Sequence, residues 1–358
     1  MTDRPVPKTT LDHATDPARD WVRILARYRT ARSARSAFEL SVTVVPLVVL
    51  WVLAVLASAV HPLLAIALSL SNALFLVRLF AIQHDCGHGA FFADRRVNDW
   101  VGRCLGVVTL TPYAVWRRSH SVHHSATGNL ERRGIGDVHT LTVREYCALS
   151  PRGRLGYRAY RNPLVMLGLF PTYLFWIQNR FPATLTEQGW RPWASAMGTN
   201  LALFTLLASA VAAFGWTTVL MAFGPTTIAA ATIGMWLFYI QHQFEETSWD
   251  RTDDWRIHDA ALHGSSHYDL PPVLGWLTAN IGIHHVHHLH ARIPFYRLPE
   301  VLDDHPALAD IRRISFTESI GCLRLKLWDE RTRRLVPFDA VTHADFRSAR
   351  SGSDATMA

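Results

Sequence analysis

Three groups of closely spaced histidines are the residues most able to do chemistry in this chain. They lie in the segments HDCGH, HSVHH and HHVHH, and their members are His84 and His88; His120, His123 and His124; and His284, His287 and His288. Residues three or four positions apart share one face of a helix. Each group can therefore present two or three imidazole nitrogens to a single point. His285 lies at the edge of that face, because it is rotated about 100° from His284.

The number of imidazoles predicts a site for two metal ions. A tetrahedral metal takes about four protein ligands and a catalytic one about three, whereas the three groups together offer eight. Imidazole is a good ligand for zinc, copper, iron and nickel, and the scarcity of carboxylates argues against magnesium or calcium. Residue types alone do not choose among these transition metals. Iron follows only where the chemistry is redox.

The composition indicates a membrane protein. Of the 358 residues, 49% are hydrophobic and 18% are charged, which is apolar for a soluble enzyme of this length. The net charge of +7 comes mostly from arginine and would suit nucleic acid, an acidic partner or anionic lipid. The position of the arginines decides between these, and we expect no nucleic-acid partner. The four cysteines form no CxxC pair, and from the polar first 38 residues we expect no cleavable signal peptide.

Two long uncharged stretches predict four membrane-spanning helices. Residues 40–76 carry no charge, and neither do residues 192–244. At about 1.5 Å per residue and a hydrocarbon core about 30 Å thick, each stretch suits two helices. We expect spans at about 40–60, 62–82, 194–214 and 217–240. The first hairpin should turn at His61-Pro62 and the second at Gly215-Trp216, in preference to Gly224-Pro225.

Four spans place both termini and all three histidine groups on one side of the membrane. Arginines cluster before the first span and between the two hairpins, whereas the hairpin tips carry none. By the positive-inside rule, this common side is cytoplasmic. The predicted fold class is therefore an all-α integral membrane protein. Its two helical hairpins should carry a cytoplasmic helical cap that holds the metals.

Three further apolar segments are too short, or too often broken by proline and glycine, to cross a membrane. Residues 101–116, 163–178 and 270–283 are expected to be interfacial or re-entrant. We divide the chain into a basic cytoplasmic N-terminal segment (1–38), a membrane domain (39–340) and a C-terminal tail (341–358). The polar composition of the tail predicts disorder.

The ordered set HDCGH, HxxHH and HxxHH resembles the membrane fatty acid desaturases, specifically the bacterial branch similar to the omega-6 (Δ12-type) acyl-lipid enzymes. A single HxxHH would be weak support, but the ordered set is specific. Other stretches resemble the same branch, and together they cover roughly residues 40–340. They are GDVHTLTVREY (136–146), YIQHQFEETSW (239–249), ALHGSSHYDLP (261–271), NIGIHHVHHLHARIPFYRLPE (280–300) and LWDERTRRLVPFD (327–339).

The resemblance implies an oxidoreductase with a non-haem di-iron centre. Such a centre uses O2 to remove two hydrogens from adjacent methylenes of a long acyl chain, which is carried by lipid, coenzyme A or a carrier protein. By the same resemblance, the eight histidines of the three groups are metal ligands, and His242 in YIQHQFEE is a ninth. The resemblance to the bacterial branch also implies that the membrane is a bacterial inner membrane, and the protein should contact its lipids along the spans.

Ligating imidazoles usually donate their second ring N–H to a carboxylate or carbonyl. Candidate acceptors are Asp85, Asp137, Asp269, Glu245 and Glu246. Asn280, one helical turn before His284, would either hold a metal-bound water or cap a helix. Four other histidines are additions to the family pattern and are expected behind the ligands or at the surface: His139, His267, His285 and His290.

The reduction of O2 requires electrons from outside the chain. The sequence contains no fused haem motif, no CxxC iron-sulfur pattern and no GxGxxG. We therefore expect a separate electron donor, such as ferredoxin with its reductase. An arginine-rich face would suit an acidic donor and anionic lipid head groups equally.

Three other functions keep part of this pattern. A hydroxylase, ketolase, epoxidase or acetylenase of the same membrane di-iron superfamily would keep similar histidine spacing. An intramembrane zinc protease would use the HxxxH of His84 and His88, but it requires a glutamate where this chain has Asp85. A metal transporter normally has polar groups within its spans, and the uncharged stretches offer almost none.

Overall fold

The computed structural model describes residues 17–182 and 189–354. Four helices in this part of the chain are long and apolar enough to cross a membrane: α2 (Ser33–Ser58), α3 (Pro62–His88), α9 (Trp190–Phe214) and α10 (Trp216–His242). At 25 to 27 residues each, they extend about 38–40 Å, compared with about 30 Å for a hydrocarbon core. The excess length lets the last turns of α3 and α10 reach beyond the hydrocarbon.

Both hairpins turn where local chemistry ends a helix. The His61 ring accepts a hydrogen bond from the Leu63 amide over 3.2 Å, and Pro62 occupies the first turn of α3, where no amide donor is needed. Gly215 separates α9 from α10, and its φ of +80° is a conformation that favours glycine. The chain thus turns at Gly215-Trp216, while Pro225 lies within α10.

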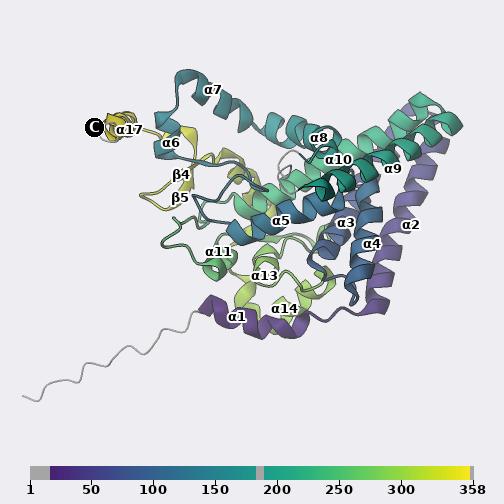
Figure 1. Ribbon diagram of the computed structural model, residues 1–358, viewed down its shortest axis with the longest axis horizontal. Coiled ribbons are helices and arrows are strands. Elements are labelled where there is room, and N and C mark those ends of the chain that lie inside the picture. The colour runs from purple at the N-terminus through teal and green to yellow at the C-terminus, as the bar shows by residue number, and fades with distance from the viewer. Residues whose placement is uncertain (1–16, 183–188, 355–358) are drawn as a thin grey trace, which may run out of the picture.

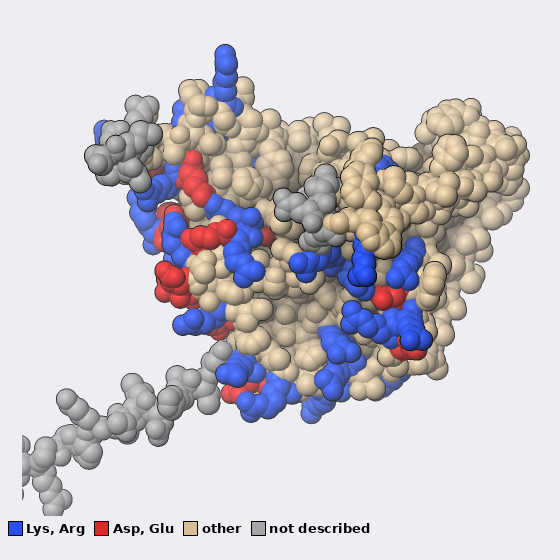
Figure 2. Space-filling model, viewed as in Figure 1, with Lys and Arg blue, Asp and Glu red and all other residues tan. Residues whose placement is uncertain are grey.

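Helix α3 is central in the bundle and packs against both α2 and α10. Small polar residues join α3 to α10: the Ser69 hydroxyl donates to the Met221 carbonyl over 2.9 Å, and the Thr226 hydroxyl donates to the Ser69 carbonyl over 2.9 Å. Helix α9 is the most exposed span. Of its apolar 18-residue stretch, 11% is buried, compared with 44% for the corresponding stretches of α3 and α10. Figure 2 shows that the projecting end of the spans, at the upper right, carries no charged side chains. A lipid environment accounts for both features.

The remaining described helices are short, and most lie to one side of the long helices (Figure 1). They are α1 (Pro17–Leu25), α4 (Arg95–Val108), α5 (Tyr113–Ala126), α6 (Val143–Ala148), α7 (Pro151–Tyr160), α8 (Phe170–Trp176), α11 (Ile257–His263), α12 (Pro272–Leu277), α13 (His284–Leu289), α14 (Leu298–Asp304), α15 (Pro306–Ala309), α16 (Phe316–Gly321) and α17 (His343–Asp354). They form a helical cap on the bundle, and α5 and α13 carry histidine groups.

Two small sheets tie distant parts of the cap together. Strand β1 (Leu141–Thr142) pairs in parallel with β4 (Leu327–Asp329), which pairs antiparallel with β5 (Arg334–Val336). Strand β2 (His267–Asp269) pairs in parallel with β3 (Arg313–Ser315). An isolated bridge between His267 and Ile283 brings β2 to the residue before α13. The second sheet therefore holds the beginning of α13 in place.

The three short apolar segments provide none of the four candidate spans. Residues 101–116 are divided between α4 and the start of α5. Residues 163–178 form a π-helical turn, Val165–Leu169, followed by α8. Residues 270–283 form α12 and the turns before α13.

The ends of the membrane domain differ from the sequence-based expectation. Helix α2 begins at Ser33, ahead of the expected start near residue 40. Its additional turns include Glu39, which can be buried because it pairs with Arg78. The prediction of disorder in the tail is wrong for α17. The Thr342 amide donates to the Asp345 carboxylate over 2.8 Å at the start of this helix, and Ala349 is buried in a small apolar cluster. Residues 1–16 and 355–358 lie outside the described residues.

Candidate metal centre

The nine histidines expected to bind metal lie on four helices. His84 and His88 occupy the last turns of α3, and His242 is the last residue of α10. The second and third groups lie on α5 and α13. Gly89 ends α3 with a φ of +65°, so the chain turns away directly after His88. The ends of two spans thus meet two cap helices at one level.

Five histidines form a first cluster: His84, His88, His120, His124 and His287. One ring nitrogen from each lies within 4.8 Å of all the others. The Nε2 atoms of His88 and His120 are 3.0 Å apart, those of His120 and His124 are 3.0 Å apart, and those of His124 and His287 are 3.1 Å apart. The nitrogens of all three sequence groups therefore converge on one position.

Four histidines form a second cluster: His123, His242, His284 and His288. Their ring nitrogens also lie within 4.8 Å of one another, and the Nε2 atoms of His242 and His284 are 3.1 Å apart. The two clusters adjoin, because the rings of His124 and His288 stack with centroids 4.1 Å apart. In the described residues, no further histidine belongs to either cluster.

The unpaired nitrogens fit a cation in each cluster. The buried Nε2 atoms of His123 and His288, both in the second cluster, have no hydrogen-bond partner. A buried polar atom without a partner is costly. In the first cluster, His120 Nε2 faces two other ring nitrogens at once, and one nitrogen carries at most one proton for both. A metal ion would satisfy all these lone pairs.

The spacing argument was wrong in one respect, because the second and third groups do not each point to a single position. His120 and His124 belong to the first cluster, whereas His123 belongs to the second. Likewise, His284 and His288 share the second cluster, whereas His287 belongs to the first. Residues i and i+4 differ by about 40° around a helix, but neighbours differ by about 100°. Each cap helix can therefore supply both clusters at once.

Hydrogen bonds behind the rings hold three imidazoles in orientation. His123 Nδ1 donates to Asp137 Oδ1 over 2.5 Å, and His242 Nδ1 donates to the Gly264 carbonyl over 3.1 Å. His84 Nδ1 lies 3.3 Å from Asp85 Oδ1, and the other oxygen of Asp85 accepts the Phe295 amide over 2.7 Å. Because Nδ1 is the donor in His123 and His242, Nε2 is left with its lone pair for a metal.

The other predicted partners of the ligating imidazoles lie elsewhere. The carboxylates of Asp269, Glu245 and Glu246 form ion pairs with Arg313, Arg334 and Arg312, respectively. These three acids are exposed enough to pair with surface arginines, and none bonds to a clustered histidine. Their positions near the histidine motifs in sequence do not place their side chains toward the clusters.

Asn280 does not cap α13. It has a φ of +51°, and the residue that precedes α13 is Ile283, which makes no side-chain capping bond. Asn280 is instead part of a tight turn in which its amide donates to the Gly275 carbonyl over 2.7 Å. The role of Asn280 in holding a metal-bound water stays a prediction.

The four additional histidines belong to neither cluster. His285 is fully buried, its Nε2 lies 2.9 Å from the Leu308 carbonyl, and burial lowers its pKa to about 3. His267 Nδ1 lies 2.6 Å from the Ala309 carbonyl. His139 is exposed, and His290 is partly buried. The rings of His267 and His285 bond to backbone carbonyls of the cap beside the clusters.

Burial favours the neutral form of the clustered imidazoles in the cap. It lowers the pKa of His120, His124, His284, His287 and His288 well below 6.5, and neighbouring histidines lower it further. The neutral imidazole is the form that binds a metal. The clusters are therefore ready for metal binding at neutral pH.

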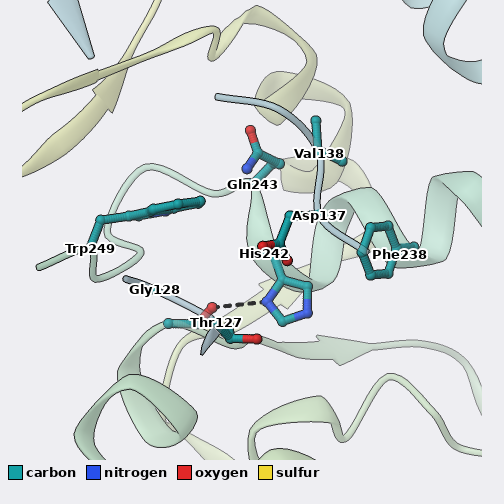
Figure 3. A pocket seen from close by; sticks show the side chains of 9 residues that line it. Thr127, Gly128, Asp137, Val138, Phe238, His242, Gln243 and Trp249 are labelled. Carbon is teal, nitrogen blue, oxygen red and sulfur yellow. Dashed lines mark hydrogen bonds between the residues drawn. The ribbon is translucent and has the colours of Figure 1, made fainter. Parts of the chain in front are cut away.

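A small pocket lies beside the second cluster (Figure 3). Its volume of about 10 Å³ is enough for about one water molecule. Figure 3 shows His242 between Phe238 and Trp249, with the bond from its ring to a backbone carbonyl drawn as a dashed line. Asp137, Thr127 and Gly128 also line the pocket. Backbone partners such as the Gly264 carbonyl leave no signal in a sequence, so sequence reasoning missed this one.

The family model described as fatty acid desaturase matches residues 59–319, which include both clusters. The chain belongs to the fatty acid desaturase family. It is similar to a fatty acid desaturase of Bacillus subtilis (strain 168), with 42% identity over 319 residues, covering 89% of this chain and 90% of that protein. This desaturase is thus a membrane-embedded oxidoreductase of lipid metabolism that acts on acyl chains.

More distant relatives from Synechocystis sp. (strain ATCC 27184 / PCC 6803 / Kazusa) support the bacterial branch. An sn-1 oleoyl-lipid 12-desaturase is 27% identical, covering 62% of this chain and 63% of the relative. An sn-1 acyl-lipid omega-3 desaturase (ferredoxin) is 28% identical, covering 62% of this chain and 61% of the relative. The family assignment made from the histidine motifs is confirmed.

Proposed function

We propose that this desaturase introduces a C=C bond into the acyl chain of a membrane lipid, using O2 and two iron ions bound by the nine clustered histidines. The convergence of these nitrogens in two adjoining clusters carries the proposal. Iron is favoured over zinc because removal of hydrogen from an unactivated methylene requires redox chemistry. Once bound, the iron pair would supply the oxidising power that the side chains lack.

The residues of the chain would orient the ligands and exclude water. Asp137 and the Gly264 carbonyl hold the rings of His123 and His242, and Asp85 lies behind His84. His123, His242, His284 and His287 are buried, so little solvent reaches the clusters. A dry centre of fixed orientation suits a reaction in which the reacting bond must be held close to the metals. Asn280 is proposed to hold a metal-bound water near His284.

The proposed substrate is an acyl chain carried by lipid. Both Synechocystis relatives are named as acyl-lipid enzymes, and the spans of this chain would place the clusters next to a bilayer. An acyl chain binds through apolar area at about 0.8 kcal/mol per buried methylene. Affinity of this kind distinguishes poorly between positions along the chain, so the shape of the binding slot must select the bond.

The proposed electron donor is a ferredoxin-type protein with its reductase. One relative is named as ferredoxin-dependent, and the net charge of +7 suits an acidic donor. We further propose that the cap and its clusters are cytoplasmic, because the arginines flank the spans on the cap side. We also propose that the membrane is a bacterial inner membrane, because a desaturase of Bacillus subtilis is similar over 89% of the chain.

The fatty acid profile of a host that expresses the protein with ferredoxin and its reductase tests the proposal. We expect a new unsaturated acyl species with the wild-type chain, none with His123→Ala, and the wild-type product with His343→Ala, which replaces an exposed histidine outside the clusters. An unsaturated species in the His123→Ala strain would contradict the proposal. Hydroxylated, oxidised or triple-bonded products would assign a related di-iron reaction, and zinc in the purified protein would exclude the redox mechanism.

A further inference from the structure

A buried ion pair lies within the spans and is not part of either cluster. Glu39 of α2 and Arg78 of α3 pair directly, and their side chains are 1% and 0% exposed. Charged residues at such positions are costly to bury and are normally retained for a function. The pair accounts for the only charges in the apolar part of α2 and α3 between residue 39 and the histidines at the end of α3.

The Arg78 guanidinium makes contacts on every side. Beyond Glu39, it donates to the Thr43 hydroxyl over 3.1 Å and to the Trp276 carbonyl. It also lies over two aromatic rings, 4.1 Å from the centroid of Trp276 and 5.2 Å from that of Phe295. A planar fork with five donors can satisfy such a set, whereas the single ammonium of lysine cannot reach all of it.

Trp276 and Phe295 flank the third histidine group. Trp276 belongs to α12, Phe295 follows the group, and α13 lies between them. Arg78 therefore contacts both flanks of the segment 276–295 from the helix that carries the first histidine group. Glu39 holds the guanidinium from one side, and Arg35 in turn donates to Glu39 over 2.7 Å.

One of these flanks also bonds behind a clustered histidine. The Phe295 amide donates to Asp85 over 2.7 Å, and Asp85 lies behind His84. Between α3 and α13, the ring centroids of His84 and His287 are 4.5 Å apart. Both belong to the first cluster. The spacing between α3 and α13 thus decides whether His287 reaches the first cluster and whether His284 and His288 reach the second.

We propose that Arg78, anchored by Glu39, is a positioning residue that holds the segment 276–295 against α3 and so completes both metal-binding clusters. This inference rests on the proposed metal-binding role of the clusters, but it does not depend on the reaction. The segment supplies one of the five histidines of the first cluster, His287, and two of the four of the second, His284 and His288. The effect of losing Arg78 should therefore be greater at the second cluster.

Metal titration of purified Arg78→Met, Arg78→Lys and Arg161→Met tests the proposal. Arg161 is the matched control, because it is also 0% exposed but bonds to Thr140, Gln243 and the Leu325 carbonyl, away from the segment 276–295. In the monodisperse fraction, Arg78→Met should bind one iron per chain with normal affinity and a second about 10–100-fold more weakly. Arg78→Lys should fall between Arg78→Met and the wild type.

Limited proteolysis gives a second readout that needs neither metal nor turnover. Arg292 is an exposed trypsin site within the segment 276–295. Cleavage after Arg292 should be faster in Arg78→Met than in the wild type and unchanged in Arg161→Met. If Arg78→Met does not fold, the iron titration and the proteolysis are done with Glu39→Gln. We expect changes in the same direction but smaller, because glutamine keeps the shape of the Glu39 side chain without its charge.

Two results would overturn the inference. Arg78→Met could bind both irons with wild-type affinity, or Arg161→Met could lose iron affinity equally, which would reduce Arg78 to a general stabilising residue. Failure of the proposed function looks different. A wild-type chain that binds two irons but forms no unsaturated product would contradict that function and leave the role of Arg78 intact.

Discussion

His123 and His124 are adjacent in sequence, yet each belongs to a different metal-binding cluster. Their ring centroids are 5.6 Å apart and their planes are 86° apart. Helix α5 thus supplies both clusters from neighbouring positions, as α13 does with His287 and His288. Two short helices connect the clusters rigidly, and their separation is fixed by backbone geometry rather than by flexible side chains.

Removal of His123 should weaken metal binding more than removal of His124. The first cluster has five histidines and keeps four in His124→Ala, which is enough for a tetrahedral ion. The second cluster has four and keeps three in His123→Ala. Iron analysis of both purified variants after dialysis against a weak chelator checks this expectation. Equal iron loss from the two variants would contradict the assignment of ligands to clusters.

Asp137→Asn should lower the metal affinity of the second cluster by about 10–100-fold, because the Nδ1 proton of His123 loses its carboxylate acceptor. Asp269→Asn is the matched control, since Asp269 pairs with Arg313 away from the clusters. Competitive titration with a chromophoric chelator measures both. An unchanged affinity in Asp137→Asn would show that the hydrogen bond to His123 does not support the ligand.

The span pattern and the histidine spacing could be predicted because each depends on residues close together in the chain. The length of the uncharged stretches predicts the membrane-spanning helices, and Pro62 and Gly215 predict where the hairpins turn. The division of histidines between clusters depends on the angle at which α5 and α13 meet the spans, and a linear sequence does not specify this angle.

Other misses have similar causes. Asp85 and Asp137 could be proposed as partners because carboxylates are the common choice, but Asp269 satisfied the same rule and instead pairs with Arg313. The Gly264 carbonyl has no side-chain signature at all. Glu39 lies in a region that charge counting excludes from a span, although pairing with Arg78 allows its burial.

Gly282→Ala should destabilise the protein by about 1–3 kcal/mol. A Cβ at Gly282 would lie 2.4 Å from the Tyr268 carbonyl, where β2 approaches the turn before α13. Relief of this clash would move the start of α13 and its His284. Gly321→Ala is the control, because nothing lies within 4 Å of its added Cβ. Thermal unfolding in detergent should show a lower midpoint for Gly282→Ala only; equal midpoints would indicate that the turn can yield.

Lys326 provides a test by pH that does not involve the clusters. Burial, and secondarily the charge of Arg161, lower its pKa from 10.5 to about 8. Its ammonium donates to the Arg161 carbonyl over 2.7 Å, but no carboxylate pairs with it among the described residues. In the window between the two pKa values, the unfolded chain binds more protons than the folded chain. Stability contributed by Lys326 therefore rises as pH increases from about 8 to 10.5.

Lys326→Met removes this titration and keeps much of the side-chain volume. The wild-type chain should gain thermal stability relative to Lys326→Met as the pH is raised from 8 to 10.5, and the difference between them should be constant below 8. Unfolding midpoints of both chains across this range provide the measurement. Arg251→Met, at an exposed ion pair with Glu131 and Glu330, corrects for general effects of losing a cation. A constant difference from pH 8 to 10.5 would mean that Lys326 keeps its proton in the folded state, and hence that solvent reaches its ammonium.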